Sequence, residues 1–192
     1  MTEDEIQNAM TEGLEALGEY EKTIFCIDPS SVSTGWAIMG RKKGADKCNI
    51  IKTGLISTKQ PKGEKVTLAR QKDMACKLHE MLSSKIDCGA LVSEEIWVEL
   101  SASRMPKVTG ALYFLAGAIH NSCDGDNVHF VRQSEWTRNV PKPKRISQVY
   151  DYFVDIPFPA DIKEKQKEDV LDAIGIGMHI LDGYNFNKQR CE

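Results

Sequence analysis

Thr23-Ile-Phe-Cys-Ile-Asp28 opens the folded part of the chain, with four apolar residues leading to a carboxylate directly before Pro29. Such a run predicts a buried strand that ends at Asp28. Two further strands are predicted at 34–39 and 48–56, and the basic turn 41–44 connects them. Because short connections favour antiparallel pairing, the three segments predict a meander.

The remaining chain alternates between predicted helices and strands. A helix at about 64–84 precedes an apolar strand at 87–95, and a helix rich in small residues at about 104–122 precedes a strand at 127–131. Ser134 is a candidate N-cap of a short helix, and two helices are expected at 145–154 and 164–181. This order predicts an α/β fold with a mixed five-stranded sheet and helices on both faces.

Length and composition indicate a single globular domain. The 192 residues suffice for a full core, and the hydrophobic and charged fractions of 41% and 28% are ordinary. Residues 1–21 form an acidic N-terminal extension, either an amphipathic helix or disordered, and 22–192 form the domain. No run is apolar enough for a membrane span, and no signal peptide is recognisable. We therefore expect no membrane partner and a cytoplasmic location, which is the host cytoplasm for a viral protein.

Cysteine spacing gives no metal signature. None of the six cysteines forms a C-x-x-C pair, so zinc is not expected. A disulfide framework is also disfavoured, because the chain is large enough to fold without one. Cys26 and Cys88 are interpreted as small hydrophobic residues in or beside strands.

Four acidic residues stand at the ends or on one side of apolar segments: Asp28, Glu94, Asp169 and Asp172. Asp169 and Asp172 are three apart on a predicted helix and share a face. Taken singly, each has an ordinary interpretation as a turn, strand-end or solvated helix residue. Together, grouped carboxylates repel one another unless divalent cations lie between them. Oxygen-rich sites suit Mg²⁺, with Mn²⁺ as a substitute, and paired ions support phosphoryl transfer.

Five segments form a set in a fixed order along residues 23–182. They are Ile27-Asp28-Pro29-Ser30 with Thr34-Gly35, then Glu94-Glu95-Ile96-Trp97, the small-residue stretch 110–118, the basic stretch 132–149, and Asp169-Val-Leu-Asp172-Ala-Ile-Gly-Ile. In this order and spacing they resemble the RuvC-type Holliday-junction resolvases of the RNase H-like superfamily. Any one match is weak, but the set is fairly specific.

The resemblance implies catalytic and metal-binding roles for Asp28, Glu94, Asp169 and Asp172. Glu95 is the alternative ligand if the strand register differs by one residue. Trp97 matches the aromatic residue that contacts bases at the junction. A core position for Trp97 is the equally weighted alternative.

The basic stretch departs from the family pattern. Val140-Pro-Lys-Pro143 replaces a glycine-rich loop, and the family's lysine aligns with Ile146, which leaves Lys144 or Arg145 as its replacement. Five cations lie within fourteen residues around Trp136, either as a solvated loop or as a clamp for DNA phosphates. The predicted DNA-binding cations are Arg132, Arg138, Lys142, Lys144 and Arg145.

These observations predict a Mg²⁺-dependent endonuclease that resolves Holliday junctions and other branched DNA. Symmetric cutting needs two active sites, so a homodimer is expected, with the helix at 104–122 at its interface. The alternatives are an RNase H-like nuclease acting on RNA or DNA flaps, a sugar-kinase or actin-like ATPase, and a catalytically inactive binding module. The ATPase fold needs a second similar lobe, which the sequence lacks.

Overall fold

The computed structural model describes residues 19–30, 32–58, 68–87, 95–100, 106–123 and 127–187. The acidic segment 1–18, with its expected helix, lies outside these ranges. Within them, no helix combines the length and the apolar character needed to cross a bilayer.

Five strands form one mixed sheet in the order β3-β2-β1-β4-β5. The meander β1 (Tyr20–Asp28), β2 (Ser33–Lys42) and β3 (Cys48–Ser57) is antiparallel, whereas β4 (Glu95–Leu100) and β5 (Val128–Arg132) run parallel to β1. The predicted five-stranded mixed sheet is therefore confirmed.

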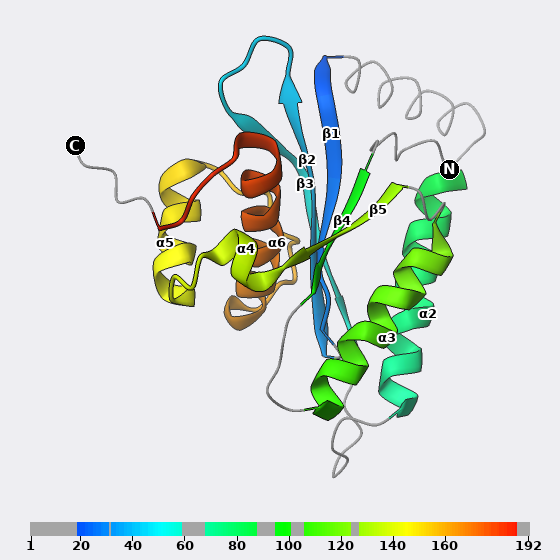
Figure 1. The fold of residues 1–192 in the computed structure, drawn as a ribbon. Coiled ribbons are helices and arrows are strands. Elements are labelled where there is room, and N and C mark those ends of the chain that lie inside the picture. Colours follow the sequence, from blue (N-terminus) through cyan, green and yellow to red (C-terminus); the bar gives the residue numbers. More distant parts are fainter. Residues whose placement is uncertain are drawn as a thin grey trace.

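Helices cover both faces of the sheet (Figure 1). On one face lie α2 (Leu68–Asp87) and α3 (Pro106–Ser122), and on the other lie α4 (Gln133–Thr137), α5 (Lys142–Tyr152) and α6 (Glu164–Asp182). Side chains of β1 alternate between the two cores: Ile24 and Cys26 pack toward α6, and Phe25 and Ile27 pack toward α2 and α3. Cys26 is a small core residue, as predicted.

Three predicted boundaries differ from the structure. The strand expected at 87–95 is instead β4 at 95–100, while α2 continues to Asp87 and 88–94 lie outside the described residues. Helix α5 begins at Lys142, three residues early, because Pro141 at its N-cap and Pro143 in its first turn suit a helix start. Ser134 does not cap α4, since Arg132 is the N-cap residue and its backbone N–H donates to the Glu135 carboxylate.

Close packing of α6 on β2 fixes the position of the acids. Gly35 lies against α6 so tightly that an added Cβ would be 2.1 Å from the Asp169 carbonyl oxygen. In the sheet, Gly35 is also the partner of Asp28. The register of β1 with β2 and the contact of β2 with α6 therefore bring Asp28 and Asp169 to the same end of the sheet.

Replacing Gly35 by alanine should lift α6 off the sheet, because the obstacle is backbone and cannot rotate away. We expect a loss of about 1–3 kcal/mol in the free energy of unfolding, measured by denaturant titration. Gly117→Ala on α3 is the control, since its Cβ would meet nothing within 4 Å and alanine favours a helix by about 1 kcal/mol. Equal stability of the two variants would contradict this packing.

Candidate active site

Three of the four predicted acids converge where β1 ends beneath α6. Asp28 is the last residue of β1, and Asp169 and Asp172 lie one turn apart on α6. Burial raises the pKa of the Asp28 carboxyl well above its usual value, and the charges of Glu99, Asp172 and Asp169 raise it further. The pKa of Asp169 is also raised, chiefly by burial, although Ser33 and Lys142 oppose the shift. The carboxylates therefore lie close enough to repel one another.

The fourth acid of this cluster is Glu99, which the sequence analysis missed. It lies on β4, and its residue is only 2% exposed. Extending the pairing of Ile27 with Val98 by one residue places Glu99 beside Asp28. Burial raises the pKa of Glu99 to about 7, opposed by a hydrogen bond from Trp136 and reinforced by the charge of Asp172.

Neither of the two glutamates predicted from the sequence, Glu94 and Glu95, is seen in the cluster. Glu94 lies outside the described residues, so its role stays a prediction. Glu95 begins β4 opposite Ile24, in the middle of β1, whereas Asp28 of the cluster is the last residue of that strand. Its carboxylate pairs with the Lys22 ammonium at 2.8 Å and accepts a 2.7 Å hydrogen bond from Trp97. The sequence does contain a pattern that points to Glu99, because it is the only charged residue within Ile96–Leu100. The predicted strand ended at residue 95, so this pattern was not used.

Lys142 places its ammonium among the acids. Its Nζ is 2.9 Å from Asp172 Oδ2, 3.5 Å from Glu168 Oε2 and 3.9 Å from Asp169 Oδ1. Burial alone would lower the pKa of Lys142, but the carboxylates of Asp172, Asp169 and Asp28, Asp172 first, raise it above its usual value. The lysine is half-buried and therefore stays charged between the cluster and solvent. The catalytic role predicted for Lys144 or Arg145 stays a prediction, and Lys142 is the cation of this stretch whose ammonium contacts Glu168, Asp169 and Asp172.

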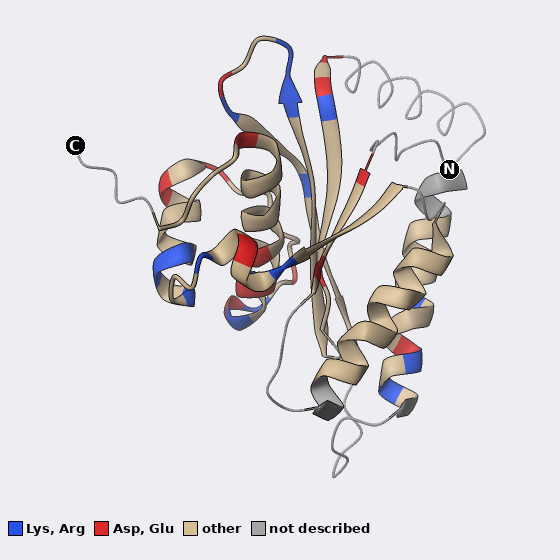
Figure 2. Cartoon of the chain, in the orientation of Figure 1, with Lys and Arg blue, Asp and Glu red and all other residues tan. Residues whose placement is uncertain are grey.

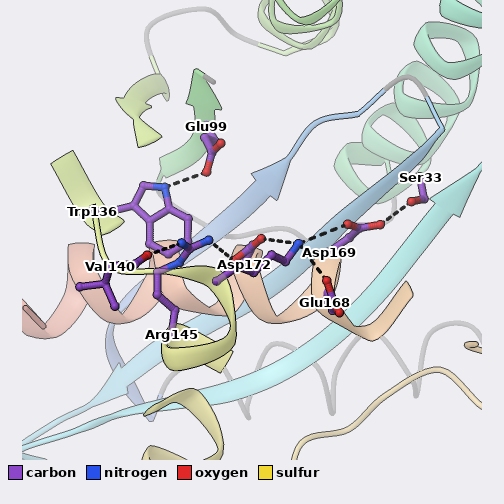
Figure 3. A network of polar contacts seen from close by, with 9 residues as sticks. Ser33, Glu99, Trp136, Val140, Arg145, Glu168, Asp169 and Asp172 are labelled. Atoms are coloured by element: carbon purple, nitrogen blue, oxygen red, sulfur yellow. Dashed lines mark hydrogen bonds and ion pairs between the residues drawn. The ribbon is translucent and has the colours of Figure 1, made fainter. Parts of the chain in front are cut away.

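Arg145 lies inside the domain rather than in an exposed clamp. Its guanidinium donates to Asp172 Oδ1 at 3.0 Å and to the Val140 carbonyl at 2.7 Å, and it stacks on Trp136 (Figure 3). The exposed predicted cations are Arg132, Arg138 and Lys144. Figure 2 shows basic residues on α5 and at the end of β5, on the same side of the molecule as the acids of α6.

Trp97 lies within the sheet, two residues before Glu99. Its half-buried ring packs against the core under α6 and stacks on His129, with ring centroids 4.8 Å apart. Its indole N–H donates to Glu95. These contacts agree with the core alternative, and contact of Trp97 with DNA stays a prediction.

The donors of the cluster fit a divalent cation such as Mg²⁺. Asp28, Glu99, Asp169 and Asp172 supply only oxygen, the ligand that Mg²⁺ and Mn²⁺ prefer. Within the described residues, no three His, Cys, Asp or Glu side chains already have the arrangement of a metal site. Lys142 supplies the positive charge there instead. The mutual repulsion that raises the pKa values is what a divalent ion relieves, so the residues suit the ion chemically.

Of the comparisons with known proteins, only the comparison with solved structures gives matches. No protein-family model and no curated protein matches the sequence. The T. thermophilus RuvC in complex with a Holliday junction substrate superposes with a TM-score of 0.59 and 14% identity, covering 85% of this chain and 97% of that one. The fold is that of the RuvC-type resolvases.

Two further resolvases share this RuvC-type fold. The yeast mitochondrial Holliday junction resolvase Ydc2 gives a TM-score of 0.54 at 13% identity, covering 89% of this chain and 84% of its own. The fowlpox virus resolvase in complex with Holliday junction DNA gives 0.50 at 15% identity, covering 84% and 97%. The predicted RNase H-like architecture is thus confirmed.

The raised pKa of Glu99 predicts how stability depends on pH. Since the folded pKa of about 7 exceeds the usual 4.5, the fold binds this proton more tightly than the unfolded chain does. That contribution is complete below pH 4.5 and is lost as pH rises through about 7. In EDTA, the melting temperature should fall between about pH 5 and pH 8.

Glu99→Gln should make the decrease in melting temperature between about pH 5 and pH 8 smaller. The decrease that remains comes from Asp28 and Asp169, whose pKa values are also raised. Mg²⁺ should restore the wild-type melting temperature most at the alkaline end, where the repulsion is largest. A pH profile that is identical in wild type and Glu99→Gln would show that Glu99 is not buried as described.

Proposed function

We propose that this protein is a divalent-cation-dependent endonuclease that resolves four-way DNA junctions and related branched DNA. The observation that carries the proposal is the convergence of Asp28, Glu99, Asp169 and Asp172 from β1, β4 and α6. The RuvC-type fold supports it, because the similar structures of T. thermophilus and fowlpox virus are described with Holliday junction DNA.

Two roles are proposed for the residues of the site: the acids would bind the ions, and Lys142 would contact the substrate. Asp28, Glu99, Asp169 and Asp172 would hold Mg²⁺, which when bound activates water and stabilises charge on the phosphate oxygens. Lys142 is half-buried beside Asp172, so its ammonium can turn from the acids to a phosphate oxygen. Burial of Glu99 and Asp172 keeps water from competing for the carboxylates.

Arg132, Arg138 and Lys144 would hold the DNA backbone beside the acids. All three are exposed, and Arg132 is the last residue of β5, the strand that pairs with β4 beside Glu99. A cavity of about 300 Å³ lies next to Arg132, lined also by Leu100, Tyr113 and Asn139. Its polar rim offers a path for the strand that continues from the cleavage point.

A twofold homodimer through α3 and the edge strand β5 would supply two active sites for symmetric cutting. Tyr113 and Phe114 on α3 are 58% and 41% exposed, and Phe130 on β5 is 40% exposed. Exposed large apolar side chains of this kind would be covered by a partner surface. Sedimentation of the DNA-free protein as a monomer at micromolar concentration would count against this assembly.

Asp28→Asn, Glu99→Gln and Asp172→Asn should each abolish cleavage of a labelled four-way junction while leaving junction binding largely intact. Removing one carboxylate weakens ion binding but also relieves repulsion. Asp73→Asn on α2 is the matched control, because Asp73 lies on the far face of the sheet and pairs only with Lys77 among the contacts described. Cleavage is measured with Mg²⁺ and with EDTA.

Parallel assays on a DNA flap and an RNA–DNA hybrid separate the proposed function from its rivals. Preference for the hybrid or the flap would indicate another RNase H-like nuclease. Glu94→Gln and Glu95→Gln complete the series, and wild-type cleavage by Glu99→Gln together with loss in Glu94→Gln would return the fourth position to Glu94.

Alanine at Arg132, Arg138 and Lys144 together should lower the slope of log K against log salt for junction binding by about 2–3, because each cation neutralises about one phosphate. Fluorescence anisotropy at several salt concentrations measures the slope. Alanine at Lys72 and Lys77, on α2, is the control. An equal slope in both variants would mean that DNA does not follow this segment.

A further inference from the structure

We infer that Trp136 is a positioning residue that links two of the acids, Glu99 and Asp172, through its indole N–H and through Arg145. The inference rests on the proposed function, since it concerns how the acids are held for a divalent ion. It assigns the tryptophan of the basic segment to the interior of the site rather than to a DNA surface.

The first link joins α4 to β4. Trp136 is 1% exposed, and its Nε1–H donates to Glu99 Oε2 at 2.8 Å. Glu99 is itself buried, so this donor replaces hydration that the carboxylate has lost. A single N–H fixes one carboxylate oxygen and leaves the lone pairs of the other for an ion. Ligands held in this way are oriented and tuned by their hydrogen-bond partners.

The second link joins α4 to α6 through α5. The Arg145 guanidinium lies 4.9 Å from the centre of the Trp136 ring and donates to Asp172 Oδ1. A second hydrogen bond, to the Val140 carbonyl, prevents the guanidinium from rotating away. Figure 3 shows the resulting chain of contacts from Glu99 through Trp136 and Arg145 to Asp172.

The indole ring of Trp136 is held in place by packing against α6 and Phe186. A Cβ at Gly175 of α6 would lie 2.7 Å from Trp136 Cζ3, so the absence of a side chain there makes room for the ring. Phe186 packs edge-on against it, with ring centroids 5.7 Å apart. The orientation of the N–H is therefore determined by packing of the indole ring against Gly175 of α6, the helix that also carries Asp172.

Trp136→Phe tests the inference because it keeps an aromatic ring under Arg145 and removes the N–H. We expect the affinity of DNA-free protein for Mn²⁺, measured by calorimetry, to fall about 10-fold or more. Cleavage should need correspondingly more Mg²⁺ for its half-maximal rate. Trp36→Phe in the opposite core is the control for shortening a buried tryptophan, and it should bind Mn²⁺ as the wild type does.

Folding of each variant is followed by its melting temperature in EDTA. A folded Trp136→Phe protein with wild-type Mn²⁺ affinity would overturn the positioning role while leaving the nuclease proposal intact. Wild-type protein that binds no Mn²⁺ would instead overturn the ion-dependent function and this inference together.

A measurement on wild-type protein covers the case in which Trp136→Phe does not fold. The chain has three tryptophans, and the spectra of Trp36→Phe and Trp97→Phe assign the indole N–H resonance of Trp136 by elimination. Titration with Mg²⁺ should shift that resonance, because its acceptor is an ion ligand, and leave that of Trp36 in place. An unmoved Trp136 resonance at saturating Mg²⁺ would overturn the inference.

Discussion

Repulsion among buried carboxylates is the constraint on which the arrangement of this end of the molecule depends. Asp28, Glu99, Asp169 and Asp172 come from three elements, and burial keeps water from screening their charges. Two features of the fold reduce this repulsion. The pKa values of Asp28 and Glu99 are raised, and the side chains of Lys142 and Arg145 pair with Asp172. Neither removes the excess of negative charge, which is why the cluster suits a divalent ion.

The two cations differ in how they can respond to such an ion. Arg145 is buried, stacked on Trp136 and bonded to a backbone carbonyl, so it is part of the framework. Lys142 stands at the start of α5, half-exposed on a flexible stem, and shares three carboxylates. An incoming ion can therefore displace the Lys142 ammonium without moving α5. The Arg145 guanidinium, in contrast, would stay in place beside Asp172 when an ion binds.

Sequence reasoning located the acids whose position follows from local pattern. Asp28 ends an unbroken apolar run, and Asp169 and Asp172 precede a glycine-rich helix stretch whose close packing was predictable. Glu99 was missed because residues 90–92 are apolar like 96–98, so nothing local decides which run is the strand. Arg145 was assigned to the surface because its partner Asp172, 27 residues away, is brought to it only by the packing of α5 on α6.

Asp182, at the other end of α6, provides a contrast to the acid cluster. Its carboxylate accepts hydrogen bonds from Arg41 at 2.9 Å, from the Cys48 backbone N–H at 3.0 Å and from the Tyr152 hydroxyl at 2.6 Å. These donors compensate its burial, so it fastens α6 to β2, β3 and α5 without an ion. The same helix thus carries one acid that is fully supplied with donors and two whose neighbours include other acids. Both ends of α6 pack on the same sheet, so the two ends differ in the charges beside their carboxylates: three donors surround Asp182, whereas Asp169 and Asp172 also lie near Asp28.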